Sequence, residues 1–141
     1  MVSFRSALAL FGIGGFLLSG CSFTPDRYPG TDVLEIPGLE VESATDLQQS
    51  GGTLQSGTLV YRGKGDLVEI FRIYVQAMEH EGWMTTYANF SGDAGSATLR
   101  KDQRVARIVF SNGKKKLTAS IQVGPATLLG KESKFRAASP S

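Results

Sequence analysis

The 141-residue chain predicts an α+β fold in which one amphipathic helix packs on a mostly antiparallel sheet of about five strands. Three observations predict it. Apolar residues recur with a helical period between residues 66 and 81, whereas apolar and polar residues alternate between residues 117 and 123. Between them, Asn112-Gly113 is a pair that favours a tight hairpin turn. The predicted order is one strand, one helix and then four strands.

Residues 1–20 follow the plan of a secretory signal, with Arg5 before an apolar stretch over residues 7–18. The segment Leu17-Leu18-Ser19-Gly20-Cys21 then resembles the lipobox of bacterial lipoproteins. The resemblance implies cleavage before Cys21 and a diacylglyceryl group on its thiol. In lipoproteins of enteric-type bacteria, a residue such as Ser22 after the cysteine, rather than Asp, favours the outer membrane over the inner membrane. The alternatives are an N-terminal membrane helix, which needs about 20 apolar residues, and an ordinary signal peptide.

Residues 21–52 are interpreted as a lipidated tether that can include a short edge strand at residues 33–36, ended by Pro37. A disordered spacer is the alternative for this segment. Cys21 is the only cysteine, so its lipidation leaves no thiol for a disulfide, a zinc site or a nucleophile.

The α+β domain is expected over residues 53–125. Its first strand, at residues 57–63, is rich in β-branched and aromatic residues and is bounded by glycines. A helix follows at residues 66–81, with Asp66 and Glu69 in a pattern like a capping box and Gly82 as its C-terminal signal. The apolar stripe of this helix consists of Leu67, Ile70, Phe71, Tyr74, Val75 and Met78, widened by Ile73 and Ala77.

After Gly82 the pattern changes to period two and predicts strands at 83–90, 97–101, 105–111 and 117–123. In the last strand, Leu117, Ala119, Ile121 and Val123 alternate with polar residues, so one face is expected to be buried. Residues 126–141 are expected to form a polar tail.

A second resemblance covers roughly residues 36–125. The run Gly57-x-Leu59-Val60-Tyr61-x-Gly63, Met78 with Gly82-Trp83, Leu99-x-Lys101 and the strand from Arg104 to Phe110 look like small, uncharacterised, single-domain envelope lipoproteins. These motifs are signatures of a fold, so the resemblance implies no activity.

Charge and composition give no support to several classes of function, namely nucleic-acid binding, metal or cofactor chemistry and glycoside hydrolysis. The formal charge is +2, with no basic stripe of the kind that nucleic-acid binding requires. His80 is the only histidine and lies between two glutamates, so the sequence predicts neither a metal site nor a cofactor. Asp93 with Glu79 or Glu81 could form a carboxylate pair for glycoside hydrolysis, but solvated surface acids are the preferred interpretation.

The candidate binding residues are basic. Lys114, Lys115 and Lys116 follow the Asn-Gly turn, where they are either a solubilising hairpin tip or a contact for an anionic partner. Other cations lie nearby in the sequence and could share part of a sheet face: Arg100, Lys101, Arg104 and Arg107.

These observations rank three functions. The leading hypothesis is a non-enzymatic, periplasm-facing envelope lipoprotein that acts as a protein-interaction or assembly accessory module. The first alternative is a module that binds cell-wall polymer or another anionic envelope component through its basic residues. An envelope hydrolase is the least favoured. The partners expected are therefore the membrane, through the lipid on Cys21, and an envelope protein or wall component.

Overall fold

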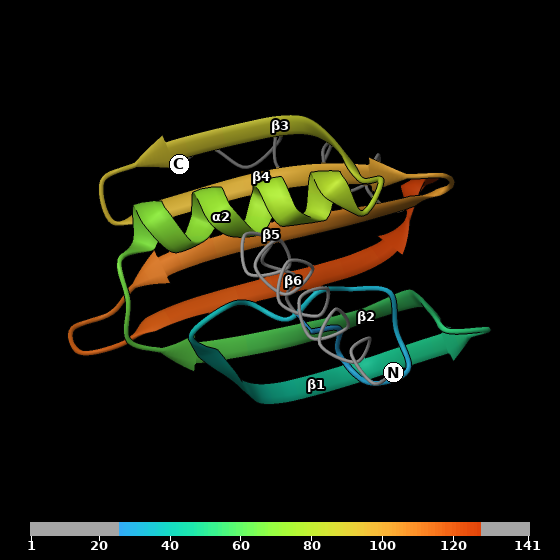
Figure 1. The fold of residues 1–141 in the computed structure, drawn as a ribbon, viewed down its shortest axis with the longest axis horizontal. Helices are drawn as coiled ribbons and strands as arrows, with labels where there is room; N and C mark the ends of the chain where they lie inside the picture. Colours follow the sequence, from blue (N-terminus) through green and yellow to red (C-terminus); the bar gives the residue numbers. More distant parts are fainter. Residues whose placement is uncertain (1–25, 128–141) are drawn as a thin grey trace, which may run out of the picture.

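The computed structural model describes residues 26–127, and it confirms the predicted α+β fold. One helix packs on a sheet in which all neighbouring strands are antiparallel (Figure 1). The sheet has six strands rather than about five, in the order β1-β2-β6-β5-β4-β3. The elements are β1 (Leu39–Ser50), β2 (Thr53–Gly63), α2 (Leu67–His80), β3 (Met84–Ser91), β4 (Ala94–Lys101), β5 (Arg104–Asn112) and β6 (Leu117–Pro125).

Helix α2 begins and ends where its local sequence signals predict. The Asp66 side chain caps the N-terminus by accepting a hydrogen bond from the backbone N–H of Glu69 at 3.0 Å. At the C-terminus, Gly82 has a φ of +99°, a conformation that glycine adopts at little cost. The N–H of Trp83 donates to Met78 O and that of Gly82 to Glu79 O, which completes a Schellman motif.

The apolar stripe of α2 lies against strands β3, β4 and β5. Leu67, Phe71, Tyr74 and Met78 are buried, as the helical period predicts, whereas Ile73, expected to widen the stripe, is exposed. Phe71 makes edge-to-face ring contacts with Phe90 and Phe110 at centroid distances of 4.6 and 5.4 Å. The predicted alternation in β6 is also present, because its apolar side chains are all buried in the same core.

The sixth strand is β1, which lies within the segment expected to be a tether. It pairs with β2, but its register shifts at three places. Nearly all of its side chains are exposed, so the strand has no buried face. Its sequence therefore has no period-two pattern of apolar residues. Backbone pairing with β2 therefore holds this edge strand, and binary patterning could not reveal it.

Residues 26–38, which we call the strap, cover the part of the sheet that α2 leaves open. Figure 1 shows this segment, in blue and cyan, on the same side of the sheet as α2 and over β2 and β6. Val33, Leu34 and Ile36 are fully or almost fully buried in the core cluster. The short strand expected at residues 33–36 is present only as a single bridge between Arg27 and Leu34. The strap thus completes the hydrophobic core.

Candidate functional site

The structure separates the predicted basic residues into two groups. Strand β5 has nine residues, so its two ends lie about 27 Å apart. Arg104 begins this strand, with Lys101 beside it at the end of β4, whereas the three-lysine segment follows the other end of β5. Arg107 lies between these ends and opposite Gln122, on the face of the sheet away from α2. The cations therefore do not form one continuous surface.

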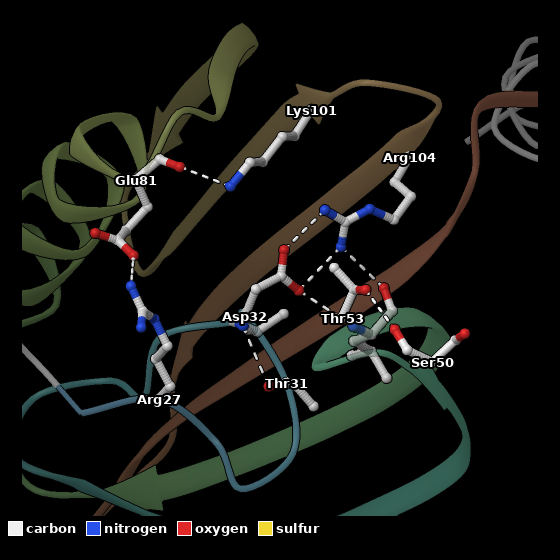
Figure 2. A network of polar contacts seen from close by, with 10 residues as sticks. Arg27, Thr31, Asp32, Ser50, Thr53, Glu81, Lys101 and Arg104 are labelled. Atoms are coloured by element: carbon white, nitrogen blue, oxygen red, sulfur yellow. Dashed lines mark hydrogen bonds and ion pairs between the residues drawn. The ribbon is translucent and has the colours of Figure 1, made fainter.

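Arg104 binds the strap instead of facing solvent. Its guanidinium makes a two-pronged ion pair with Asp32, with Nη1–Oδ1 and Nη2–Oδ2 distances of 3.0 and 2.7 Å (Figure 2). It also donates to Leu54 O at 3.0 Å and lies 5.0 Å from the ring centroid of Trp83. Only 9% of the Arg104 side chain and 19% of the Asp32 side chain is exposed. Arg104 is thus a structural residue that joins β5 to the strap.

The Asp32 carboxylate is stabilised in its charged form. Burial by itself raises the pKa of Asp32, but hydrogen bonds from Arg104 and the Leu54 N–H, together with the Arg104 charge, outweigh burial. The net result is a pKa below the ordinary value for aspartate. The Arg104 guanidinium and the Leu54 N–H therefore bind this carboxylate, and hold the strap, most firmly near neutral pH, where Asp32 is charged.

Two further polar contacts fix the strap and the end of α2. Arg27 forms an ion pair with Glu81, which raises the pKa of the Arg27 guanidinium mainly through their hydrogen bond. Lys101 Nζ donates to Glu81 O at 2.7 Å, and both contacts are visible in Figure 2. At the centre of the strap, Tyr74 Oη donates to Leu34 O at 2.8 Å in a fully buried position.

The second group of cations forms a cavity of about 340 Å³, which we call the basic pocket. It lies where three turns meet. Figure 1 shows these turns at the left-hand ends of the strands. These turns are the β2–α2 connection, the β3–β4 turn and the β5–β6 hairpin. The lining residues are Lys64, Gly65, Asp93, Asn112, Gly113, Lys114, Lys115, Lys116 and Leu117. The sequence indicated the three consecutive lysines, but not that Lys64 joins them.

Two backbone hydrogen bonds define the rim of the basic pocket. Asn112 N donates to Asp93 O and Gly113 N donates to Lys116 O, both at 2.8 Å. A side chain at Gly113 would place its Cβ 2.9 Å from Lys116 O, so the tight hairpin requires glycine there. The turns that carry the charged side chains are therefore held together before any ligand arrives.

Strand β3 forms the other unusual surface. Within residues 26–127 it pairs only with β4, so its outer edge has no strand neighbour. It carries no charged residue, and it presents Met84, Tyr87 and Phe90 with exposed fractions of 61, 54 and 41%. In contrast, β1 at the opposite edge carries Glu40, Glu42 and Asp46 and is repeatedly bulged. Of the two edge strands, only β3 is uncharged, and its register shifts once, between Thr85 and Tyr87, rather than three times.

Neither carboxylate pair considered for hydrolysis forms, because Glu79 and Glu81 both lie at the C-terminal end of α2, away from Asp93. Glu79 accepts a hydrogen bond from Thr85 at the start of β3, whereas Asp93 follows the end of that strand. Because β3 has eight residues, the two carboxylates lie more than about 20 Å apart, well beyond the separation of about 10 Å that glycosidases use. Within residues 26–127, no three His, Cys, Asp or Glu side chains are placed to hold a metal ion, and His80 is exposed.

Cys21, the signal expected at residues 1–20 and all but the first two residues of the expected tail lie outside the described residues. Among the helices of the described part, none has the length and apolar character needed to cross a bilayer. Comparison with protein-family models and with curated proteins finds no match to this chain. Two observations therefore bear on function: the sequence around Cys21 and the geometry of residues 26–127.

Proposed function

We propose that the protein is a lipid-anchored, non-enzymatic envelope protein that acts as a protein-interaction or assembly accessory module. The sequence Leu17–Cys21 supports the anchor, because it places the sole cysteine directly after two small residues. The exposed edge of β3 supports the interaction role. In this account the lipid holds the domain at the membrane, and β3 binds the partner.

The physics of the anchor favours permanent attachment. Each buried CH₂ group contributes about 0.8 kcal/mol, so one acyl chain binds marginally whereas two or three chains hold the protein on the membrane. Ser22 after the cysteine favours the outer membrane, with the domain facing the periplasm.

The observation that carries the interaction role is the uncharged edge of β3, whose pairing with β4 is regular from Tyr87 to Ser91. An exposed strand edge presents unpaired N–H and C=O groups, and proteins usually protect such edges with lysine, proline or bulges. Beyond its one bulge between Thr85 and Tyr87, β3 has none of these protections. Register with β4 is regular from Tyr87 to Ser91, which leaves about five residues available for pairing.

The occupant that fits this edge is an extended segment of another protein. Main-chain hydrogen bonds supply the affinity in strand addition, and alternate side chains supply the specificity. Tyr87 and Asn89 lie on one face of β3, whereas Phe90 contacts Phe71 on the other. Because β3 is uncharged, its partner segment should also be uncharged and should have apolar side chains opposite Tyr87 and Phe90.

Site-specific photocrosslinking in cells tests this proposal. A photoreactive amino acid at Asn89 should give one adduct of defined mass with a single envelope protein, and the crosslinked peptide of that protein should be extended and uncharged. The same amino acid at Ser43, on the protected edge of β1, is the matched control and should not give this adduct.

The variant Tyr87→Lys should abolish the adduct, because a charge on an edge strand blocks pairing, whereas Ser43→Lys should leave it unchanged. An adduct containing only peptides of this chain would show self-association and refute the partner assigned here. Equal adducts from Asn89 and Ser43 would refute the role of β3.

The basic pocket favours a second candidate function, the binding of an anionic envelope component. Salt-sensitive binding that is lost when Lys114, Lys115 and Lys116 are all changed to glutamine would support it, because surface electrostatic attraction is screened by salt. Binding that the triple substitution leaves unchanged would remove it.

A further inference from the structure

The lining of the basic pocket combines positive charge with hydrogen-bonding groups of a different kind. Four ammonium groups belong to Lys64, Lys114, Lys115 and Lys116, and one carboxylate belongs to Asp93. Lysine provides compact positive charges with up to three donors each, which suits a phosphate or a carboxylate. The excess of cations over Asp93 therefore selects an anionic group.

Asp93 and Asn112 indicate what else the ligand carries. A carboxylate within a cluster of lysines weakens the attraction for a bare polyanion, but it accepts hydrogen bonds from hydroxyl groups. The Asn112 amide can both donate to and accept from hydroxyls. Among the described residues, the pocket lining includes no aromatic side chain on which a nucleobase could stack. A ligand with an anionic group and several hydroxyls matches this combination.

The size of the pocket is also suitable. Its volume of about 340 Å³ lies at the lower end of the range of about 300–1,000 Å³ that small-molecule sites occupy. Gly65, which lines the pocket, leaves room for Ile70, because a Cβ there would lie 2.3 Å from Ile70 Cδ1. The cavity can thus hold one sugar unit, but its open side lets a longer chain continue into solvent.

The ligand's anionic group could belong to a lipid headgroup or to a glycan. The position of the pocket relative to the anchor helps to distinguish these two sources. Arg27 contacts Glu81 at the end of the domain opposite the pocket, and Cys21 precedes Arg27 by only six residues. Six residues span at most about 20 Å, whereas the pocket lies about 27 Å away, at the other end of β5. If Cys21 is the anchor, the domain can present the pocket away from the bilayer that holds it.

We propose that the basic pocket binds an anionic saccharide, with its phosphate or carboxylate held by the lysines and its hydroxyls by Asp93 and Asn112. This inference deepens the second candidate function and is independent of the β3 edge. The membrane-distal placement additionally rests on the proposed anchor at Cys21. A glycan chain that carries acidic groups is the macromolecular form of such a ligand.

Binding can be measured with four probes on the full-length protein purified from membranes into neutral phosphatidylcholine nanodiscs. The probes are glucose 6-phosphate, glucose, inorganic phosphate and phosphatidylglycerol vesicles, followed by isothermal titration calorimetry or, for the vesicles, by co-sedimentation. Glucose 6-phosphate should bind more tightly than each of the other three. Its affinity should fall about fivefold for each pocket lysine changed to glutamine, which is the effect of removing one charge at about 4 Å near water.

Two further variants make the assignment specific. Asp93→Ala should weaken glucose 6-phosphate relative to inorganic phosphate, because it removes both carboxylate oxygens that accept from hydroxyls, whereas the loss of the negative charge favours both anions. Arg100→Gln removes one positive charge at the far end of β4 and should change neither affinity. Circular dichroism and thermal unfolding confirm that each variant is folded.

Several results would overturn the inference. Inorganic phosphate that binds as tightly as glucose 6-phosphate would identify a simple anion site, and preferred binding of the vesicles would identify a lipid site. No binding of any probe would refute a ligand site in this pocket. Tyr87→Lys should leave binding of all four probes unchanged. Loss of the β3 interaction can therefore be distinguished from loss of binding at the basic pocket.

Discussion

Removal of the Asp32 carboxylate should destabilise the domain, because it leaves a buried cation without its counter-ion. In Asp32→Ala, the Arg104 guanidinium loses both of its charged hydrogen bonds and keeps only Leu54 O as an acceptor. The Leu54 N–H, which donates to Asp32 at 3.1 Å, also loses its partner. Two polar groups near the core are thereby left unsatisfied by one substitution.

The expected magnitude follows from the burial of the pair. Breaking a buried ion pair by removing one partner costs about 3–5 kcal/mol. Because the Asp32 side chain is 19% exposed, water can compensate partly, and we expect a loss of about 3 kcal/mol in the free energy of unfolding. With an m-value of about 2 kcal/mol per molar urea, the unfolding midpoint should fall by about 1.5 M.

Urea unfolding of the protein without residues 1–21, followed by tryptophan fluorescence, measures this loss through Trp83, which lies beside Arg104. Asp26→Ala is the matched control, because it removes an exposed carboxylate from the same strap, and it should cost less than about 0.5 kcal/mol. A double-mutant cycle with Arg104→Met should give a coupling energy above about 1 kcal/mol. A loss below 1 kcal/mol in Asp32→Ala, or additive effects in the cycle, would refute this account of the strap.

Three other changes test particular contacts. The pKa of Asp32 is lowered in the folded state. The stability that its carboxylate contributes is therefore complete above the ordinary pKa of about 3.9 and is lost as the pH falls through the lower folded value. In urea titrations from pH 6 to pH 2, the free energy of unfolding should fall more steeply in the native protein than in Asp32→Ala. Tyr74→Phe leaves the buried Leu34 carbonyl unpaired and should cost about 1–2 kcal/mol in the same assay, whereas no change would indicate another donor for that carbonyl. Gly57→Ala should lower the midpoint of thermal unfolding by several degrees. Gly57 has a φ of +141°, and a Cβ there would lie 2.5 Å from Leu47 Cδ2. An unchanged midpoint would contradict this close packing.

Local signals predicted the parts of the fold that depend on neighbouring residues. Asp66 and Gly82 mark the ends of α2, and the alternation in β6 marks its buried face. Strand β1 has no such signal, since an edge strand with exposed side chains needs no apolar periodicity. The sequence therefore indicated a tether where the structure has a strand and the strap.

The candidate sites are harder to predict from the sequence, because tertiary structure brings their residues together. Asp32 and Arg104 are 72 residues apart, so no local pattern could pair them, and the sequence places Arg104 only near other cations. Lys114, Lys115 and Lys116 were recognised as a cluster because they are consecutive. Lys64 joins them only because the β2–α2 connection and the β5–β6 hairpin meet at one end of the sheet.

The proposed function depends on lipidation of Cys21, which mass spectrometry of the N-terminal peptide can detect. The native protein should be isolated from bacterial membranes and digested without reducing or alkylating reagents. The mature chain should begin at Cys21, with a diacylglyceryl group on its sulfur and an additional acyl chain on its amino group. An N-terminus at another residue, or a Cys21 with a free thiol, would contradict the account.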